Sequence, residues 1–371
     1  MYSPETISEF TELKPWWRTE VPTEVVLTDD GVGALLARLE KEGRKPFFVI
    51  DRVLEGQPEF GPIFATGPLF IFDATFSEPR TSDVNELRAE ILTLPVLPDT
   101  IIGIGGGASM DLAKATAICL ANPEPAEHYQ GYGLDMKKGA DIWVLPALNG
   151  TGAEITPIAV LRGPEKKLGI NNPYTESKIA FIDPQLSAGA SHFNRFFTMM
   201  DCYFHHYEIM ESKTSSKAAI EDAKDGLALS REVLSCDLTE YSLPRAIKSA
   251  MASILGGSST IGGRVGAAHA ISYGLSNSAP HLPHSVAVTL AMSALEDIYP
   301  DGFAETKAFL AKNGFAMPKA ADYGITEAEL PKMTKTALGM DKLWHSCFGD
   351  GWEQKATAEY IQKIYKKILG A

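Results

Sequence analysis

The sequence predicts two domains, an α/β domain with a parallel sheet over residues 1–188 and an all-helical domain over residues 189–371. Short apolar runs alternate with helical patterns in the first part, as expected for strands joined by helices. After Asp183-Pro184 these runs end, and helical periodicity continues to the C-terminus. With 371 residues, the chain is long enough to form both domains.

Five apolar runs of strand length make up the expected sheet, at residues 25–27, 46–50, 69–72, 101–104 and 142–145. The carboxyl ends of parallel strands meet at one edge of a sheet, where α/β proteins bind ligands. Asp51 directly follows the second run. A carboxylate there can accept hydrogen bonds from an adenosine ribose and repel a 2′-phosphate, which favours NAD over NADP. The alternative is an acidic residue that caps a surface loop.

Two glycine-rich turns follow neighbouring strands. Glycines 105–107 come directly after the fourth run and before a helical pattern, so the backbone can approach a diphosphate at a helix N-terminus. The turn at 150–152 follows the fifth run. Either turn alone could need glycine for steric reasons, but two at adjacent strand ends form one crevice. Together they predict a Rossmann-like nucleotide-binding domain.

The second half contains a set of candidate metal ligands. Asp201 and His205 have the i,i+4 spacing that places two side chains on one helix face, and His269 and His284 follow farther along the chain. One carboxylate with three imidazoles suits a divalent transition metal. Each histidine alone is more often structural, so the inference depends on their joint occurrence with the glycine turns.

The amino-acid composition limits the kinds of partner that the protein is expected to bind. A net charge of −13 argues against nucleic acid or an anionic membrane surface, because both need clustered Lys and Arg. No signal segment precedes the first domain and no apolar stretch of about 18 residues occurs, so we expect a cytoplasmic protein that contacts no membrane. The four cysteines have no paired spacing, which indicates reduced thiols. A small molecule is the expected ligand.

These motifs resemble the iron-containing, or group III, alcohol dehydrogenases, whose fold is shared by dehydroquinate synthase. The resemblance is carried by the glycine turn with Asp111, by Gly-Thr-Gly-Ala-Glu at 150–154, by Asp183-Pro184 and by the candidate ligands. Within that family the sequence is most similar to the branch that oxidises the C8 hydroxyl of 3-deoxy-D-manno-octulosonate (Kdo). The segments that carry this finer likeness lie at 129–131, 167–171, 200–203, 269–276 and 352–355.

The resemblance implies a role for particular residues. Four fall on the positions of the ligands to Fe²⁺ or Zn²⁺, namely Asp201, His205, His269 and His284. Five fall on positions that contact NAD, namely Gly106, Gly107, Asp111, Thr151 and Lys167, and Asp51 falls on the position associated with NAD preference.

The sequence departs from the family pattern at several places, and two of them concern the metal site and the proton. The spacing from His269 to His284 is one residue longer than expected, so His281 is a rival fourth ligand. We favour His284 because it follows Pro283 at an expected helix start. Tyr273 stands where the family commonly has a further histidine, so Tyr273 or His281 is expected to release the substrate proton.

The expected activity is metal-dependent, NAD-linked oxidation of an alcohol to an aldehyde or ketone. The resemblance implies Kdo or a related sugar acid as substrate, within lipopolysaccharide biosynthesis, an aminotransferase that uses the product, and a homodimer. Alternatives are a general short-chain alcohol dehydrogenase, a sugar-phosphate cyclase of the dehydroquinate-synthase type and an inert binding protein. The cyclase metal site typically has a glutamate with two histidines, so the pair Asp201 and His205 argues against it.

Overall fold

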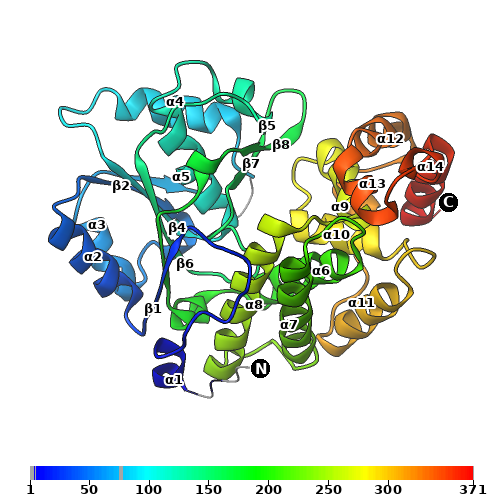
Figure 1. Cartoon of the computed structure of the whole chain (residues 1–371), viewed down its shortest axis with the longest axis horizontal. Helices are drawn as coiled ribbons and strands as arrows, with labels where there is room; N and C mark the ends of the chain where they lie inside the picture. The colour runs from blue at the N-terminus through cyan, green and yellow to red at the C-terminus, as the bar shows by residue number, and fades with distance from the viewer. Residues whose placement is uncertain (1–3, 5, 75–77, 371) are drawn as a thin grey trace. The chain divides into compact units, whose positions relative to one another are not determined.

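The computed structural model describes residues 4, 6–74 and 78–370. The chain divides into two compact units, which are described separately. The α/β unit contains residues 21–190 and the N-terminal segment up to residue 16. The helical unit contains residues from 191 onward together with residues 17–20. Figure 1 labels the elements along the chain.

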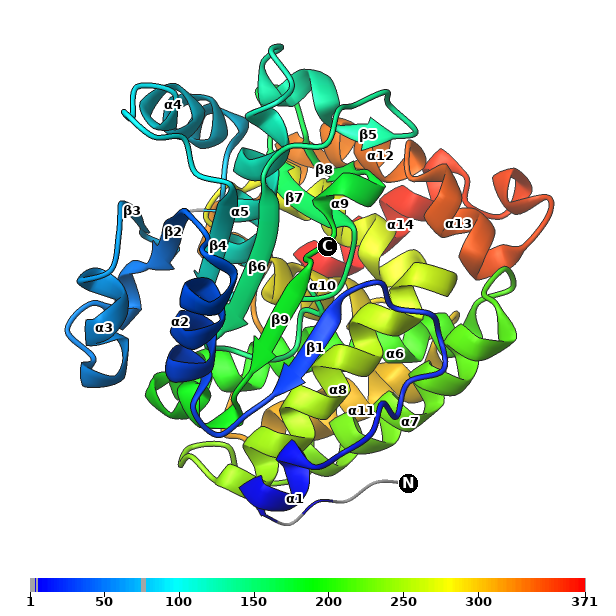
Figure 2. The same ribbon diagram turned by 60° about the vertical axis from the view of Figure 1, so that its left-hand side comes forward.

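A six-stranded parallel sheet forms the centre of the α/β unit, in the order β1-β9-β6-β4-β2-β3 (Figure 2). The strands are β1 (Glu24–Leu27), β2 (Pro46–Asp51), β3 (Leu69–Phe72), β4 (Thr100–Gly105), β6 (Asp141–Pro146) and β9 (Ile179–Ile182). The predicted fold class is confirmed, and the five expected runs are five of these strands. The sixth, β9, was not predicted and lies between β1 and β6.

Helices α2 (Gly31–Glu42) and α5 (Gly107–Cys119) cover opposite faces of this sheet. Successive side chains of a strand point to opposite faces. Ile104 of β4 therefore packs in the core cluster that includes the apolar side chains of α2. Gly103 lies against α5, where a Cβ would come within 2.9 Å of Met110 Cα. The glycine lets α5 approach β4 closely.

A second sheet and several short helices complete the α/β unit. The second sheet was not predicted and has the order β5-β8-β7, with β5 (Gly131–Tyr132), β7 (Ile158–Arg162) and β8 (Lys167–Asn171). The remaining α-helices are α1 (Ile7–Thr11), α3 (Gly61–Phe64) and α4 (Thr81–Ile91).

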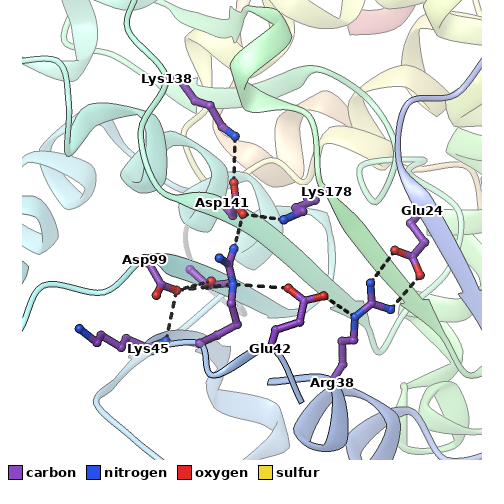
Figure 3. A network of polar contacts seen from close by, with 10 residues as sticks. Glu24, Arg38, Glu42, Lys45, Asp99, Lys138, Asp141 and Lys178 are labelled. Atoms are coloured by element: carbon purple, nitrogen blue, oxygen red, sulfur yellow. Dashed lines mark hydrogen bonds and ion pairs between the residues drawn. The ribbon is translucent and has the colours of Figure 1, made fainter. Parts of the chain in front are cut away.

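A polar network runs along the sheet edge where the parallel strands begin (Figure 3). Asp141, the first residue of β6, accepts hydrogen bonds from Arg44 and from Lys178 Nζ at 2.9 Å, and Lys138 Nζ lies 3.0 Å away. Beside it, Arg38 forms two 2.9 Å hydrogen bonds with Glu24 of β1. These contacts connect the starts of several strands at the edge opposite the glycine turns.

Every regular element described in the helical unit is a helix. The α-helices are α6 (His192–Glu211), α7 (Lys217–Leu234), α8 (Leu243–Gly262), α9 (Ala267–Ser278), α10 (His284–Met292), α11 (Pro300–Lys312), α12 (Leu330–Leu338), α13 (Asp341–Phe348) and α14 (Ala358–Leu369). Helix α6 packs on α7, α8 and α10, and α9 packs on α10 and α12. Within the described chain, no helix has the length and apolar character needed to cross a membrane.

Small residues in α7 and α8 make room for a buried histidine of α6. The His206 ring contacts the Ala252 carbonyl through Nε2 at 3.1 Å. A Cβ on Gly226 would lie 2.0 Å from His206 Cε1, so no larger residue fits there without movement. Burial lowers the pKa of His206 to about 3, which keeps the ring neutral.

Asp222 of α7 attaches the short N-terminal segment 17–20 to the helical unit. Its buried carboxylate accepts hydrogen bonds from the backbone N–H groups of Arg18 at 2.7 Å and Thr19 at 3.0 Å, and from Ser258 Oγ at 3.0 Å. The Arg18 guanidinium also forms an ion pair with Asp225 at 2.8 Å. Backbone groups of the segment are thus satisfied by one side chain.

Candidate metal centre and nucleotide site

Helix α6 presents the first donors of the candidate metal centre. Ser191 caps its N-terminus by accepting a hydrogen bond from Asn194 N. Asp201 and His205 lie one turn apart on one face, as their spacing predicts. The Asp201 side chain is buried and His205 is half-buried.

Helices α9 and α10 bring two more imidazoles to these donors. One donor atom from each of Asp201, His205 and His269 lies within 4.8 Å of the others. The rings of His205 and His269 stack with centroids 4.7 Å apart. His284 Nε2 lies 3.9 Å from Asp201 Oδ1, and α10 begins at His284, as the Pro-His pair predicts. All four proposed ligands therefore surround the same place in the helical unit.

The polar atoms at this place fit a metal ion. Among the described residues, Asp201 Oδ1, His205 Nδ1 and His269 Nε2 are buried and have no hydrogen-bond partner. Buried polar groups without partners are costly and rare in folded proteins. A carboxylate oxygen and imidazole nitrogens form a donor set for iron or zinc. The arrangement therefore fits a divalent transition metal.

The charges around His269 favour a positive charge at this place. Burial opposes the charged form of His269, but the carboxylates of Glu208 and Asp201 on either side raise its pKa to about 9. Burial likewise opposes ionisation of Asp201, and the neighbouring imidazoles reverse this and hold its pKa well below the usual range. Metal ligands must be deprotonated, so a bound cation would replace the proton on His269.

Sequence analysis did not identify Glu208, which contacts His269. This buried carboxylate lies on α6, three residues after His205, and its Oε2 is hydrogen-bonded to His269 Nδ1. Its Oε1 accepts a 2.6 Å hydrogen bond from Ala268 N. The spacing Asp201, His205, Glu208 continues one helix face and was the available signal.

Tyr273 and His281 occupy different environments. Tyr273 is half-buried on α9, one turn after His269, and its ring centroid lies 6.4 Å from that of His284. His281 is exposed in the connection between α9 and α10. Tyr273 therefore lies beside one of the proposed ligands, and a role in proton release stays a prediction for both residues.

The glycine turns and Asp51 meet at the carboxyl edge of the six-stranded sheet. Gly105 has φ +138, and a Cβ there would lie 2.7 Å from Asp51 Cβ. Gly106 is the N-cap of α5, and a Cβ on Gly107 would lie 3.0 Å from Thr151 Oγ1. Because these glycines have no side chains, the two turns lie close together at the N-terminus of α5. The N–H groups and the positive dipole end of that helix favour a diphosphate there.

The other predicted cofactor positions contact protein groups. Asp111 Oδ2 accepts a 3.0 Å hydrogen bond from Val160 N, and this bond joins α5 to β7. Lys167 is buried and forms an ion pair with Glu78. Asp51 is also buried, and this burial raises its pKa to about 6. Four of the six positions, Asp51, Gly106, Gly107 and Thr151, thus share one edge.

Comparison with known proteins finds similarity to one family. Residues 22–184 match the family model described as iron-containing alcohol dehydrogenase. The sulfoacetaldehyde reductase of Bifidobacterium kashiwanohense, solved in complex with NAD+, aligns with a TM-score of 0.80 at 19% identity, over 96% of this chain and 100% of that chain. The family match covers less than half of the chain, and the structural likeness extends over nearly all of it. The relatives that match this chain are named as dehydrogenases or reductases, which supports the expected oxidoreductase class.

Curated relatives match shorter segments of this chain. Long-chain-alcohol dehydrogenase 1 of Geobacillus thermodenitrificans is 30% identical over 190 residues, 48% of this chain and 46% of that protein. Sulfoacetaldehyde reductase of Bilophila wadsworthia is 31% identical over 112 residues, 30% of this chain and 29% of that protein. The chain thus spans less than half the length of either relative, and neither is named for Kdo.

Proposed function

We propose that the protein oxidises an alcohol to an aldehyde or ketone with NAD, and that a divalent metal is held by Asp201, His205, His269 and His284. The observation that carries this proposal is the convergence of three donor atoms within 4.8 Å, with His284 beside them. The family match over residues 22–184 and the NAD-binding structural relative support it.

When bound, the metal ion supplies Lewis acidity that lowers the pKa of a substrate hydroxyl, and NAD supplies the hydride acceptor. Asp201 contributes the negative charge of the ligand set and the three neutral imidazoles complete it. In the α/β unit, the N-terminus of α5 would hold the diphosphate of NAD, and Asp51 would accept hydrogen bonds from its ribose. The Tyr273 hydroxyl is the proposed first stop for the substrate proton, with exposed His281 as the alternative.

For the substrate we propose Kdo, oxidised at its C8 hydroxyl, or a related sugar acid. The segments that resemble the Kdo branch support this proposal. Two relatives are named as sulfoacetaldehyde reductases, and sulfoacetaldehyde also carries an acidic group. An aldehyde product would suit an aminotransferase in lipopolysaccharide biosynthesis. We further propose a cytoplasmic homodimer that holds iron or zinc.

The test is NADH formation by protein that has been stripped of metal and reloaded anaerobically with iron(II) or zinc(II). Kdo, 1-propanol and 1,2-propanediol are compared as substrates. Turnover of Kdo with little turnover of the small alcohols supports the sugar-acid proposal. Turnover of small alcohols alone identifies a general dehydrogenase. If no substrate yields NADH, the oxidoreductase proposal fails and phosphate release from a sugar phosphate is measured next, as the cyclase alternative requires.

A further inference from the structure

Helix α9 begins without a capping side chain of its own. Its N-cap is Gly266, and no side-chain cap bond is present there. The first N–H groups of a helix need partners from elsewhere. Here the Ala267 N–H donates to Tyr299 Oη at 3.1 Å, and the Ala268 N–H donates to Glu208 Oε1 at 2.6 Å. Side chains distant in sequence therefore cap the helix that carries His269.

The absence of a side chain at Gly266 lets Tyr299 and Glu208 approach the start of α9. A Cβ at this position would lie 2.4 Å from Tyr299 Oη and 3.3 Å from Glu208 Oε1. Both partners are buried, with Glu208 only 1% exposed. The positive end of the helix dipole also favours a carboxylate at this place. The position of Glu208 is thus fixed by the start of α9.

The second carboxylate oxygen of Glu208 determines which nitrogen of His269 is available. Oε2 is hydrogen-bonded to Nδ1, and a carboxylate can only accept, so the proton lies on Nδ1. When His269 is neutral, as a metal ligand must be, Nε2 carries the lone pair, 3.6 Å from Asp201 Oδ1. A hydrogen bond of this kind from a ligating histidine to a carboxylate fixes both the tautomer and the ring orientation.

We propose that Glu208 is a positioning residue of the metal centre: it caps α9 and holds His269 with Nε2 directed toward Asp201. The inference deepens the proposed function, on which it rests for the presence of a metal. In the contacts described above, Glu208 is hydrogen-bonded to only one of the four proposed metal ligands, His269, so its effect on the metal acts through that imidazole.

The test substitutes Glu208→Gln, which keeps the shape of the side chain. If the amide oxygen continues to accept from Ala268, the amide nitrogen faces His269 Nδ1 and favours the wrong tautomer. Zinc(II) affinity is measured by competition with a chromophoric chelator, and the visible spectrum of the cobalt(II) form is recorded. We expect zinc(II) to bind about 10- to 100-fold more weakly and the cobalt spectrum to change. Glu211→Gln, an exposed position on the same helix, should leave both unchanged.

Glu208→Asp retains the charge but is too short to reach both Ala268 N and His269, so its affinity should lie between the wild-type and Glu208→Gln values. A folded Glu208→Gln protein with wild-type zinc affinity and cobalt spectrum overturns the proposal. Where that variant does not fold, wild-type affinity in Glu208→Asp overturns it. If the wild type binds zinc but oxidises no alcohol, the proposed function fails while the positioning role stands. If the wild type binds no metal, both fail.

Discussion

Asp201 Oδ1 of α6 lies 3.6 Å from His269 Nε2 of α9, and neither atom has a hydrogen-bond partner among the described residues. Two helices thus present complementary metal donors to each other across a buried space. A bound cation would satisfy both atoms at once. We therefore expect changes at this pair to affect both metal affinity and the stability of the fold.

Replacing Asp201 should remove the metal. Asp201→Ala eliminates the carboxylate of the ligand set, and we expect zinc(II) affinity to fall by more than about 100-fold, beyond the effect of losing an outer partner. His345→Ala removes an exposed histidine of the same unit and serves as the control. Titration with zinc(II) against a competing chelator measures both, and unchanged affinity in Asp201→Ala would exclude it as a ligand.

Removing the metal should also lower thermal stability. A ligand that binds only the folded state stabilises it by about 3 kcal/mol when its free concentration is ~100-fold above Kd. We therefore expect a chelator to lower the Tm of the wild type and to leave that of Asp201→Ala unchanged. Differential scanning calorimetry with and without zinc(II) compares the two, and equal shifts in both proteins would argue for metal binding elsewhere.

Asp51 should control the choice between NAD and NADP. Asp51→Ala removes the charge that repels a 2′-phosphate, so the ratio of kcat/KM for NADP to that for NAD should rise by about tenfold or more, equivalent to ~1.4 kcal/mol. Because burial raises the pKa of Asp51 to about 6, the carboxylate is ionised above that pH and protonated below it. Wild-type preference for NAD should therefore weaken as pH falls from neutral through about 6. The same ratio in Glu55→Gln, an exposed acid nearby, should not change.

Asp141 should make stability depend on pH in the acid range. Burial opposes its ionisation, but hydrogen bonds from Lys178, Lys138 and Arg44 outweigh this and lower its pKa from 3.8 to about 2. A depressed carboxylate pKa stabilises the fold above the unfolded-state value, and this contribution, about 2 kcal/mol, is lost as pH falls through the folded value. Urea unfolding should show a smaller loss between pH 5 and 2 for Asp141→Asn than for the wild type. Parallel losses would mean that Asp141 contributes little.

Gly226 should tolerate no side chain. Gly226→Ala would place a methyl group 2.0 Å from His206 Cε1 in the interior, and overpacking of this kind costs about 1–3 kcal/mol. Gly61→Ala is the matched control, because a Cβ there meets no atom within 4 Å. Chemical unfolding should therefore show destabilisation in the first variant only. Equal stability of the two would mean that His206 moves without cost.

The fold was predictable where the signal is local. Apolar runs and glycine turns indicate strands and the ligand edge because each depends on neighbouring residues. The position of β9 between β1 and β6 was not predictable, since strand order depends on contacts between distant segments. β7 contains the apolar run 158–161, which is as long as the run at 69–72, so this strand was overlooked although its signal is local. In β8 the apolar side chains are only Leu168 and Ile170, so its signal is weak.

The candidate site shows the same division. The i,i+4 spacing of Asp201 and His205 follows from helix geometry, but their approach to His269 depends on how α6 and α9 pack. Glu208 was missed because a single glutamate in a helix is usually solvated, and only the tertiary contact with His269 distinguishes it. The contacts of Asp111 with Val160 and of Lys167 with Glu78 were likewise not predictable, because they depend on how distant segments pack together.

Metal-dependent oxidation is tested by measuring bound metal and NADH formation in parallel as iron(II) or zinc(II) is added to stripped wild-type protein with an alcohol substrate. We expect the rate to rise with occupancy of a single site per chain, and Asp201→Ala to show neither binding nor turnover. Full activity in metal-free protein, or in Asp201→Ala, would contradict metal-dependent oxidation.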